Sequence, residues 1–278
     1  MRATDARLSD LTDYLRAEGR PRVWSIIVTI LGDVAEPMGG AIDMQALLAV
    51  CRTLGIEEQA VRTAMSRLQK EGLVASARSG RRASYQFSAL ARESYREAAK
   101  VIYAAPHKPE RWAAALLPPP PERARVLGEL KGTHPFVLAD AMVFWPKDSG
   151  FAEEARLRIG ARAFWTETRA TNAPDWAARD HAPKINAEMC DVVRTVAEGI
   201  ADTRPSDPHE TLAIRILMIH FWRRLVLRHP PIHAPLPNDL WPMTETQAAL
   251  AKAYPLLVEA SAPASGGAGT ALERFRQI

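Results

Sequence analysis

The sequence predicts a multidomain α+β protein that begins with a winged helix-turn-helix and continues with a central α+β domain and a C-terminal helical domain. Three observations support this prediction. Apolar residues recur at helical spacing in three successive segments of 22–72, and the segment that follows alternates as a β-hairpin does. Strand-like and helix-like segments then mix over 104–175. From residue 185 onward helical periodicity dominates.

The three helices of the first domain have recognisable ends. The first carries a stripe of apolar side chains at helical spacing, formed by Trp24, Ile27, Val28 and Leu31. We expect it to stop at Gly32 and Asp33, which resemble a helix terminus. Asp43 is placed to cap the second helix, which runs to Gly55. The third helix is expected over 57–71, with acidic residues in its first turn.

A hairpin and a linker helix follow. Strands are expected over 73–78 and 81–87, joined by a two-residue turn at Ser79 and Gly80. The predicted segments are an N-terminal arm at 1–21, the winged helix-turn-helix at 22–88, a linker helix at 89–103, the central domain at 104–175 and the C-terminal helical domain at 176–278.

The central domain is predicted from strand-like segments at 112–117, 136–145 and 161–168 and a helical one at 122–130. The segment 136–145 reads either as one long strand or as a strand pair. The C-terminal domain is predicted from three helices at 185–201, 210–227 and 244–259.

Positive charge is concentrated in the first domain. The whole chain has a formal net charge of only +4. The stretch 60–96 alone holds eight basic and two acidic residues, a net charge of +6, so the rest of the chain is slightly acidic. A local basic region of this kind is typical of a surface that contacts nucleic acid.

Other features of composition indicate a cytoplasmic protein. Cys51 and Cys190 lie far apart and belong to no ligand-spaced cluster, which favours buried thiols in a reducing compartment. We expect no signal peptide and no membrane association, because the most apolar run, 26–31, is far shorter than a membrane span.

The third helix carries the clearest candidate site. Its apolar residues form one stripe, and its opposite face holds side chains that can reach base edges or phosphates: Gln59, Arg62, Thr63, Ser66, Arg67 and Lys70. That face carries no acid. Three arginines lie around the tip of the hairpin, where they can clamp phosphate or enter the minor groove: Arg78, Arg81 and Arg82. The alternative is a solvated polar helix face beside an arginine-rich surface hairpin. Helix and hairpin together favour binding to double-stranded DNA.

Several motifs in order along the chain resemble the PaaX family of bacterial repressors. They are Ser25 to Asp33, Gly39-Gly40, Val61 to Ala64, Arg67-Leu68, Glu71-Gly72, Gly80 to Arg82, Tyr85, Trp112, Phe144 to Pro146, His220 to Arg224, Arg228, Pro230, Leu236-Pro237 and Leu240 to Pro242. This resemblance covers about residues 20–255. It implies a winged helix-turn-helix, a central ferredoxin-like dimerisation domain and a helical C-terminal domain.

The resemblance also implies a function. Such a regulator is a homodimer that represses a phenylacetate-type catabolic operon and leaves its operator when an acyl-CoA thioester such as phenylacetyl-CoA binds. This chain departs from the family pattern at His229, at Met243 and at the end of the hairpin over 87–90. The effector can therefore be a different acid or acyl-CoA.

Candidate effector residues lie together near the end of an apolar helix: His220, Trp222, Arg223 and Arg224. The two arginines can hold CoA phosphates, and the two rings can stack on an aryl or adenine group. The alternative is that Arg223 and Arg224 pair with acids of neighbouring segments and fix their packing.

Catalysis is the rival class of function, and the sequence argues against it. His229 and His233 have metal-like spacing, but the two prolines after His229 prevent the helix that would align both rings. The predicted central domain resembles that of small CRISPR-associated nucleases, which place an aspartate at the end of the first strand. Here that position, 116–119, holds no carboxylate. A scaffold of the same fold that binds no DNA is a further alternative, which the basic stretch disfavours. We therefore expect no enzyme, no metal and no cofactor beyond a small-molecule effector.

Overall fold

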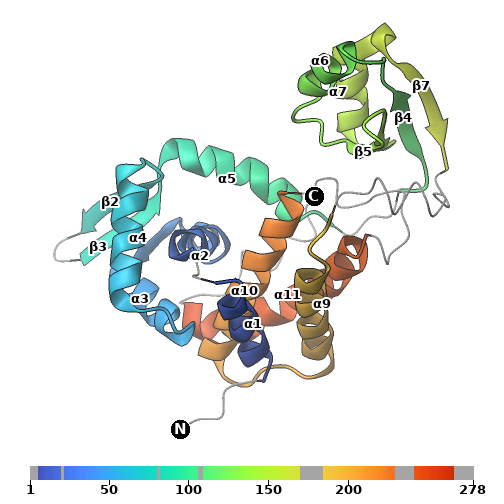
Figure 1. Cartoon of the computed structure of the whole chain (residues 1–278). Coiled ribbons are helices and arrows are strands. Elements are labelled where there is room, and N and C mark those ends of the chain that lie inside the picture. Colours follow the sequence, from blue (N-terminus) through green and yellow to red (C-terminus); the bar gives the residue numbers. More distant parts are fainter. Residues whose placement is uncertain are drawn as a thin grey trace. The chain divides into compact units, whose positions relative to one another are not determined.

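Figure 1 shows the computed structural model of the chain, which describes residues 6–19, 22–79, 82–105, 109–169, 184–228 and 241–265. For 77–79, 82–83 and 265 it describes the backbone alone. The chain divides into two compact units. The first unit comprises Met1–Ala105, Asp191–Arg224 and Ala248–Ile278, and the second unit comprises Pro106–Cys190 and Leu225–Gln247. The predicted α+β class is confirmed, since helices and two small antiparallel sheets are both present.

The N-terminal part of the first unit contains the expected helices and hairpin. Its elements are α2 (Val23–Ile30), α3 (Met44–Thr53), α4 (Glu58–Lys70), β2 (Val74–Ser79) and β3 (Arg82–Phe87). The Asp43 carboxylate accepts a hydrogen bond of 2.7 Å from the Ala46 backbone N–H, so its role as the cap of α3 is confirmed. Val74 pairs with Phe87 and Ser79 with Arg82, which makes β2 and β3 an antiparallel hairpin.

Two features of this region differ from the sequence prediction. The first helix does not stop at Gly32 and Asp33; it continues as a π-helical turn over Leu31–Ala35 and a short helical turn over Glu36–Met38. A strand β1 (Ala41–Asp43) was also not predicted, because three residues are too few for a periodic signal. It pairs with β3 and completes a sheet in the order β1-β3-β2.

Helices from both ends of the chain complete the first unit. They are α1 (Ala6–Ala17), α5 (Ala89–Ile102) and the greater parts of α9 (Ala187–Asp202), α10 (Pro208–Val226) and α11 (Met243–Ser265). The segment predicted as a short N-terminal arm, with a helix as one option, contains a packed helix. Leu8, Leu11, Tyr14 and Leu15 of α1 are buried, and the Tyr14 ring meets Phe221 of α10 edge-on at 5.3 Å between centroids. The predicted arm, winged segment and C-terminal helices thus share one unit.

The second unit is built on a four-stranded antiparallel sheet in the order β5-β6-β4-β7. Its elements are β4 (Trp112–Leu116), α6 (Glu122–Glu129), β5 (Phe136–Leu138), β6 (Met142–Pro146), α7 (Gly150–Ile159) and β7 (Phe164–Thr168). The fully buried Trp145 occupies the core, and its Nε1 donates to the Thr133 carbonyl at 2.9 Å. The segment 136–145 is a strand pair, because Ala139 and Asp140 adopt positive φ and turn the chain.

Helix α7 was not predicted from the sequence. Its buried side chains are Ala152, Ala155 and Ile159, and two alanines give a weak hydrophobic stripe. Both cysteines are buried thiols, as predicted, and burial raises the pKa of Cys51 to about 12. No helix in the described ranges is long and apolar enough to span a membrane.

Gly32 explains why the first helix continues, and it provides a test. A Cβ at this position would overlap the ring of Tyr95 in α5, whose hydroxyl donates to the Gly32 carbonyl at 2.6 Å. We expect Gly32→Ala to lower the free energy of unfolding by about 1–3 kcal/mol, because the ring and α5 must move. Urea denaturation measures this loss.

Gly199→Ala is the matched control, because Gly199 is a helical glycine of the same unit whose added Cβ would make only an ordinary 3.7 Å contact with Arg7. We expect the control to be unchanged or stabilised by up to about 1 kcal/mol. Equal effects of the two substitutions would contradict the close packing of α5 on the π-helical turn.

Candidate functional site

The outer face of α4 presents the side chains predicted to contact DNA. Val61, Ala64, Met65 and Leu68 are buried on its inner face. The six predicted residues Gln59, Arg62, Thr63, Ser66, Arg67 and Lys70 are all exposed. The structure therefore brings them onto one continuous helix face, called here the α4 face. The Thr63 hydroxyl donates to the Gln59 carbonyl at 2.8 Å, which leaves its lone pairs free to accept.

The acid-free character of this face needs correction. Arg62 bonds Glu58 at 2.6 Å and Arg67 bonds Glu71 at 2.7 Å, each across one helical turn. Glu58 and Glu71 lie just outside the stretch 59–70, each one helical turn from its arginine. Both ion pairs are exposed and contribute no more than about 1 kcal/mol each. A phosphate group can therefore replace the carboxylate at either arginine.

The three arginines predicted to contact DNA from the hairpin are Arg78, Arg81 and Arg82, and their side chains lie outside the described part of the structure. Arg78 and Arg82 lie in β2 and β3, but their side chains are not among those described, and Arg81 lies outside the described residues. Their role in DNA binding stays a prediction. His229 and His233 also lie outside the described residues; in the part of the chain that is described, no group of three His, Cys, Asp or Glu side chains could hold a metal.

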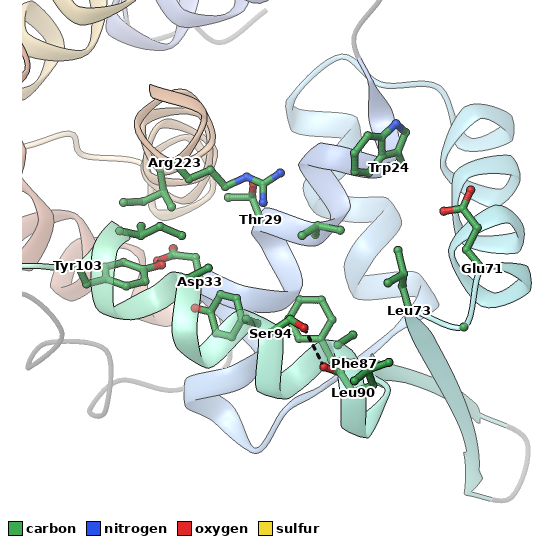
Figure 2. Close-up of a pocket in the computed structure, with 17 residues that line it drawn as sticks. Trp24, Thr29, Asp33, Glu71, Leu73, Phe87, Leu90, Ser94, Tyr103 and Arg223 are labelled. Atoms are coloured by element: carbon green, nitrogen blue, oxygen red, sulfur yellow. Dashed lines mark hydrogen bonds between the residues drawn. The ribbon is translucent and has the colours of Figure 1, made fainter. Parts of the chain in front are cut away.

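Next to the C-terminal end of α4 the first unit contains a pocket of about 340 Å³. Figure 2 shows Trp24 of α2, Leu73 and Phe87 of the hairpin region, Leu90 of α5 and Arg223 of α10 around it. The Arg67 guanidinium lies over the Trp24 ring, 5.9 Å from its centroid, so one residue of the α4 face contacts one wall of the pocket.

All four predicted effector residues make contacts within the chain. Trp222 is fully buried, and its Nε1 donates to the Ile102 carbonyl of α5 at 2.8 Å. Arg224 pairs with Glu18, as in the alternative role considered for it. The buried His220 places its Nδ1 3.3 Å from the Thr29 hydroxyl. Of these four, Arg223 alone lines the pocket.

A buried polar cluster next to the pocket was missed by sequence reasoning. The Asp33 carboxylate accepts hydrogen bonds of 2.7 Å from Arg215 Nε, Tyr103 and Tyr254. Arg215 also donates to the Asp33 carbonyl. This Asp33 cluster joins the π-helical turn to α5, α10 and α11. The sequence does hold one sign of this cluster: Arg215 interrupts the otherwise apolar run 212–219 of α10, so a buried cation with a partner could have been expected there.

His220 makes stability depend on pH. Burial, aided by the charges of Arg223 and Arg224, lowers its pKa from 6.5 to about 3. Below pH 6.5 the unfolded chain therefore takes up a proton that the folded chain does not, so stability falls as pH drops from 6.5 toward 3. At pH 5 this loss amounts to about 2 kcal/mol.

The test compares urea denaturation at pH 7.5 and pH 5 for three proteins. The wild type loses stability between them, and His220→Gln is expected to lose about 2 kcal/mol less, since it has no imidazole to protonate. His209→Gln, which changes an exposed histidine of the same helix, is the control. An identical loss in wild type and His220→Gln would exclude His220 as the cause.

Comparison with known proteins identifies the family. The family model described as PaaX-like protein matches residues 22–91, and the model described as PaaX-like protein C-terminal domain matches residues 181–264. The chain belongs to the PaaX-like family. The transcriptional repressor PaaX of Escherichia coli strain K12 is similar to this PaaX-like chain, with 26% identity over 249 residues, which cover 78% of this chain and 73% of the repressor.

Among solved structures, the uncharacterized protein Rv0674 from Mycobacterium tuberculosis resembles this PaaX-like chain with a TM-score of 0.39 and 16% identity. The match covers 79% of this chain and 90% of that one.

Proposed function

We propose that this PaaX-like chain is a DNA-binding transcriptional repressor that inserts α4 into the major groove. The observation that carries the proposal is the α4 face, where three cationic and three uncharged polar side chains are exposed on one side of a helix. Arg62 has the geometry to bond guanine in a bidentate manner, and Lys70 near the helix end suits phosphate. The relative named as a transcriptional repressor supports the same function.

The arrangement of elements supports the two domain types expected from the sequence. Over 23–87 the order helix, strand, helix, helix, strand, strand, with the hairpin joined to β1 in one sheet, is that of a winged helix-turn-helix. Over 112–168 the β-α-β-β-α-β order is that of a ferredoxin-like domain.

The proposed repressor acts as a homodimer on a near-palindromic operator. A twofold dimer presents two α4 faces to successive major grooves. Leu116 and Phe164 support association through the second unit, because they are register partners on β4 and β7 and are 46% and 69% exposed. Size-exclusion chromatography with light scattering tests this, and a monomer at micromolar concentration would contradict it.

The effector and the operon are proposed from the family. We expect an aromatic-acid catabolic operon and release from DNA by an aryl-CoA thioester such as phenylacetyl-CoA, or by another acyl-CoA or acid. Operator DNA must then weaken effector binding by the same factor. In a panel of acyl-CoA thioesters, one should release the DNA; if none does, the effector class is wrong.

Arginine substitutions on the α4 face test the proposed function. We expect Arg62→Ala and Arg67→Ala each to weaken binding to DNA from upstream of the chain's own gene roughly tenfold or more, because each loses a base or phosphate contact worth about 1–3 kcal/mol. Gel-shift titration measures the affinities.

Arg125→Ala is the matched control. Arg125 is an exposed arginine of α6 in the second unit, and it pairs with Glu129 across one helical turn as Arg62 does with Glu58. The control should keep wild-type affinity. If all three variants bind equally well, the α4 face is not the DNA-binding surface.

A further inference from the structure

The pocket next to the C-terminal end of α4 has mainly apolar walls. Side chains of α2, the hairpin region, α5 and α10 form them, and Figure 2 shows the aromatic rings of Phe87 and Tyr103 on its α5 side. At about 340 Å³ it reaches the size range of small-molecule sites. It is too small for a whole coenzyme A thioester but large enough for a compact aryl or alkyl group.

One cation of this pocket lacks a counter-anion. Arg223 donates through Nη2 to the Ser25 hydroxyl at 2.6 Å and to the Ser25 carbonyl at 3.3 Å. Its Nε is buried and has no hydrogen-bond partner within the described residues. No carboxylate in the described ranges pairs with this guanidinium. Burial lowers the pKa of Arg223, as expected for a cation that has lost water without gaining an anion.

The two carboxylates that line the pocket are already neutralised. Asp33 is bonded by Arg215 and by two tyrosine hydroxyls, and Glu71 pairs with Arg67. The uncompensated charge at the pocket is therefore positive and belongs to Arg223. A partly buried cation without a counter-anion is costly, and an anionic ligand reduces that cost.

We propose that this pocket binds a small monocarboxylic acid, whose carboxylate accepts from Arg223 and whose apolar body contacts the walls around Trp24 and Phe87. The inference goes beyond the proposed function, because it assigns a site and a free acid as its ligand. The site adjoins the DNA-binding surface, since Gly72 and Leu73 line it just after α4 and Trp24 contacts Arg67.

Isothermal titration calorimetry without DNA tests the proposal on the full chain. The probes are benzoate, 3-phenylpropionate and hexanoate, each compared with its uncharged primary amide at pH 7.5. At least one acid should bind with 1:1 stoichiometry, and its amide should bind roughly tenfold more weakly or worse, because a charge-assisted hydrogen bond is lost. No binding by any acid up to 5 mM (roughly the weakest range of specific affinity), or equal binding of acid and amide, would overturn the proposal.

Two variants localise the ligand. Arg223→Gln should lower the affinity for the acid roughly tenfold or more. Ala98→Phe keeps the arginine and fills the pocket from α5, so it should abolish binding even if Arg223→Gln fails to fold. Arg204→Gln, which removes an exposed arginine paired with Glu259 outside the pocket, should bind as the wild type does. Unchanged binding in Ala98→Phe would place the ligand elsewhere. These outcomes do not depend on whether the protein binds DNA.

Discussion

Asp33→Ala is expected to lower the free energy of unfolding by about 3–5 kcal/mol, since it leaves the guanidinium of Arg215 buried without its counter-charge. The side chains of Arg215 and Asp33 are only 3% and 1% exposed, and their 2.7 Å contact is the one ion pair that the described residues bury completely. The substitution also removes the acceptor of the Tyr103 and Tyr254 hydroxyls. Urea denaturation followed by circular dichroism measures the loss.

Two further variants make this prediction specific. The double variant Asp33→Ala/Arg215→Met no longer buries the guanidinium of Arg215 without a counter-charge. We therefore expect it to be more stable than Asp33→Ala. Asp43→Ala removes the exposed cap of α3 and should cost only about 1 kcal/mol. A loss from Asp33→Ala no larger than that from Asp43→Ala would show that the cluster does not hold α5, α10 and α11 to the π-helical turn.

Trp222→Ala should destabilise the chain by about 3–5 kcal/mol, because it empties a fully buried site and leaves the Ile102 carbonyl without its donor. Trp222→Phe keeps most of the ring volume and loses mainly the hydrogen bond, so a smaller loss of about 1–3 kcal/mol is expected. Thermal denaturation ranks the two variants.

The same experiment separates two roles for Trp222. As a residue that stacks on an effector, Trp222 would be dispensable for stability, and Trp222→Ala would unfold at the wild-type temperature. As a core residue that fixes α5 against α10, it makes both variants less stable in the stated order.

Local patterns explain what could be predicted from the sequence. The apolar stripe of α4 predicts which side of the helix is buried. The opposite side, with Arg62 and Arg67, must then be exposed. Asp43 acts on a backbone N–H three residues away, so its cap is visible in the sequence. The hairpin follows from alternation on both sides of a short turn.

Long-range contacts explain what could not be predicted. Asp33 and Arg215 are 182 positions apart, and no spacing rule joins them. Gly32 resembles a helix stop, yet its missing side chain admits the Tyr95 ring and the helix continues. The sequence offered Arg223 as a candidate, but the pocket combines side chains of α2, α5 and α10. Neither its apolar walls nor the missing counter-anion of Arg223 could therefore be inferred from any one segment.

The central claim is that the α4 face binds DNA, and its salt dependence is the most direct test. Fluorescence anisotropy with DNA from upstream of the chain's own gene gives the association constant at several salt concentrations. We expect its logarithm to fall linearly with log salt, by about 0.9 for each phosphate contacted. The double variant Arg62→Ala/Arg67→Ala should bind more weakly and with a shallower slope. Absence of saturable binding, or a slope unchanged in the double variant, would contradict the account.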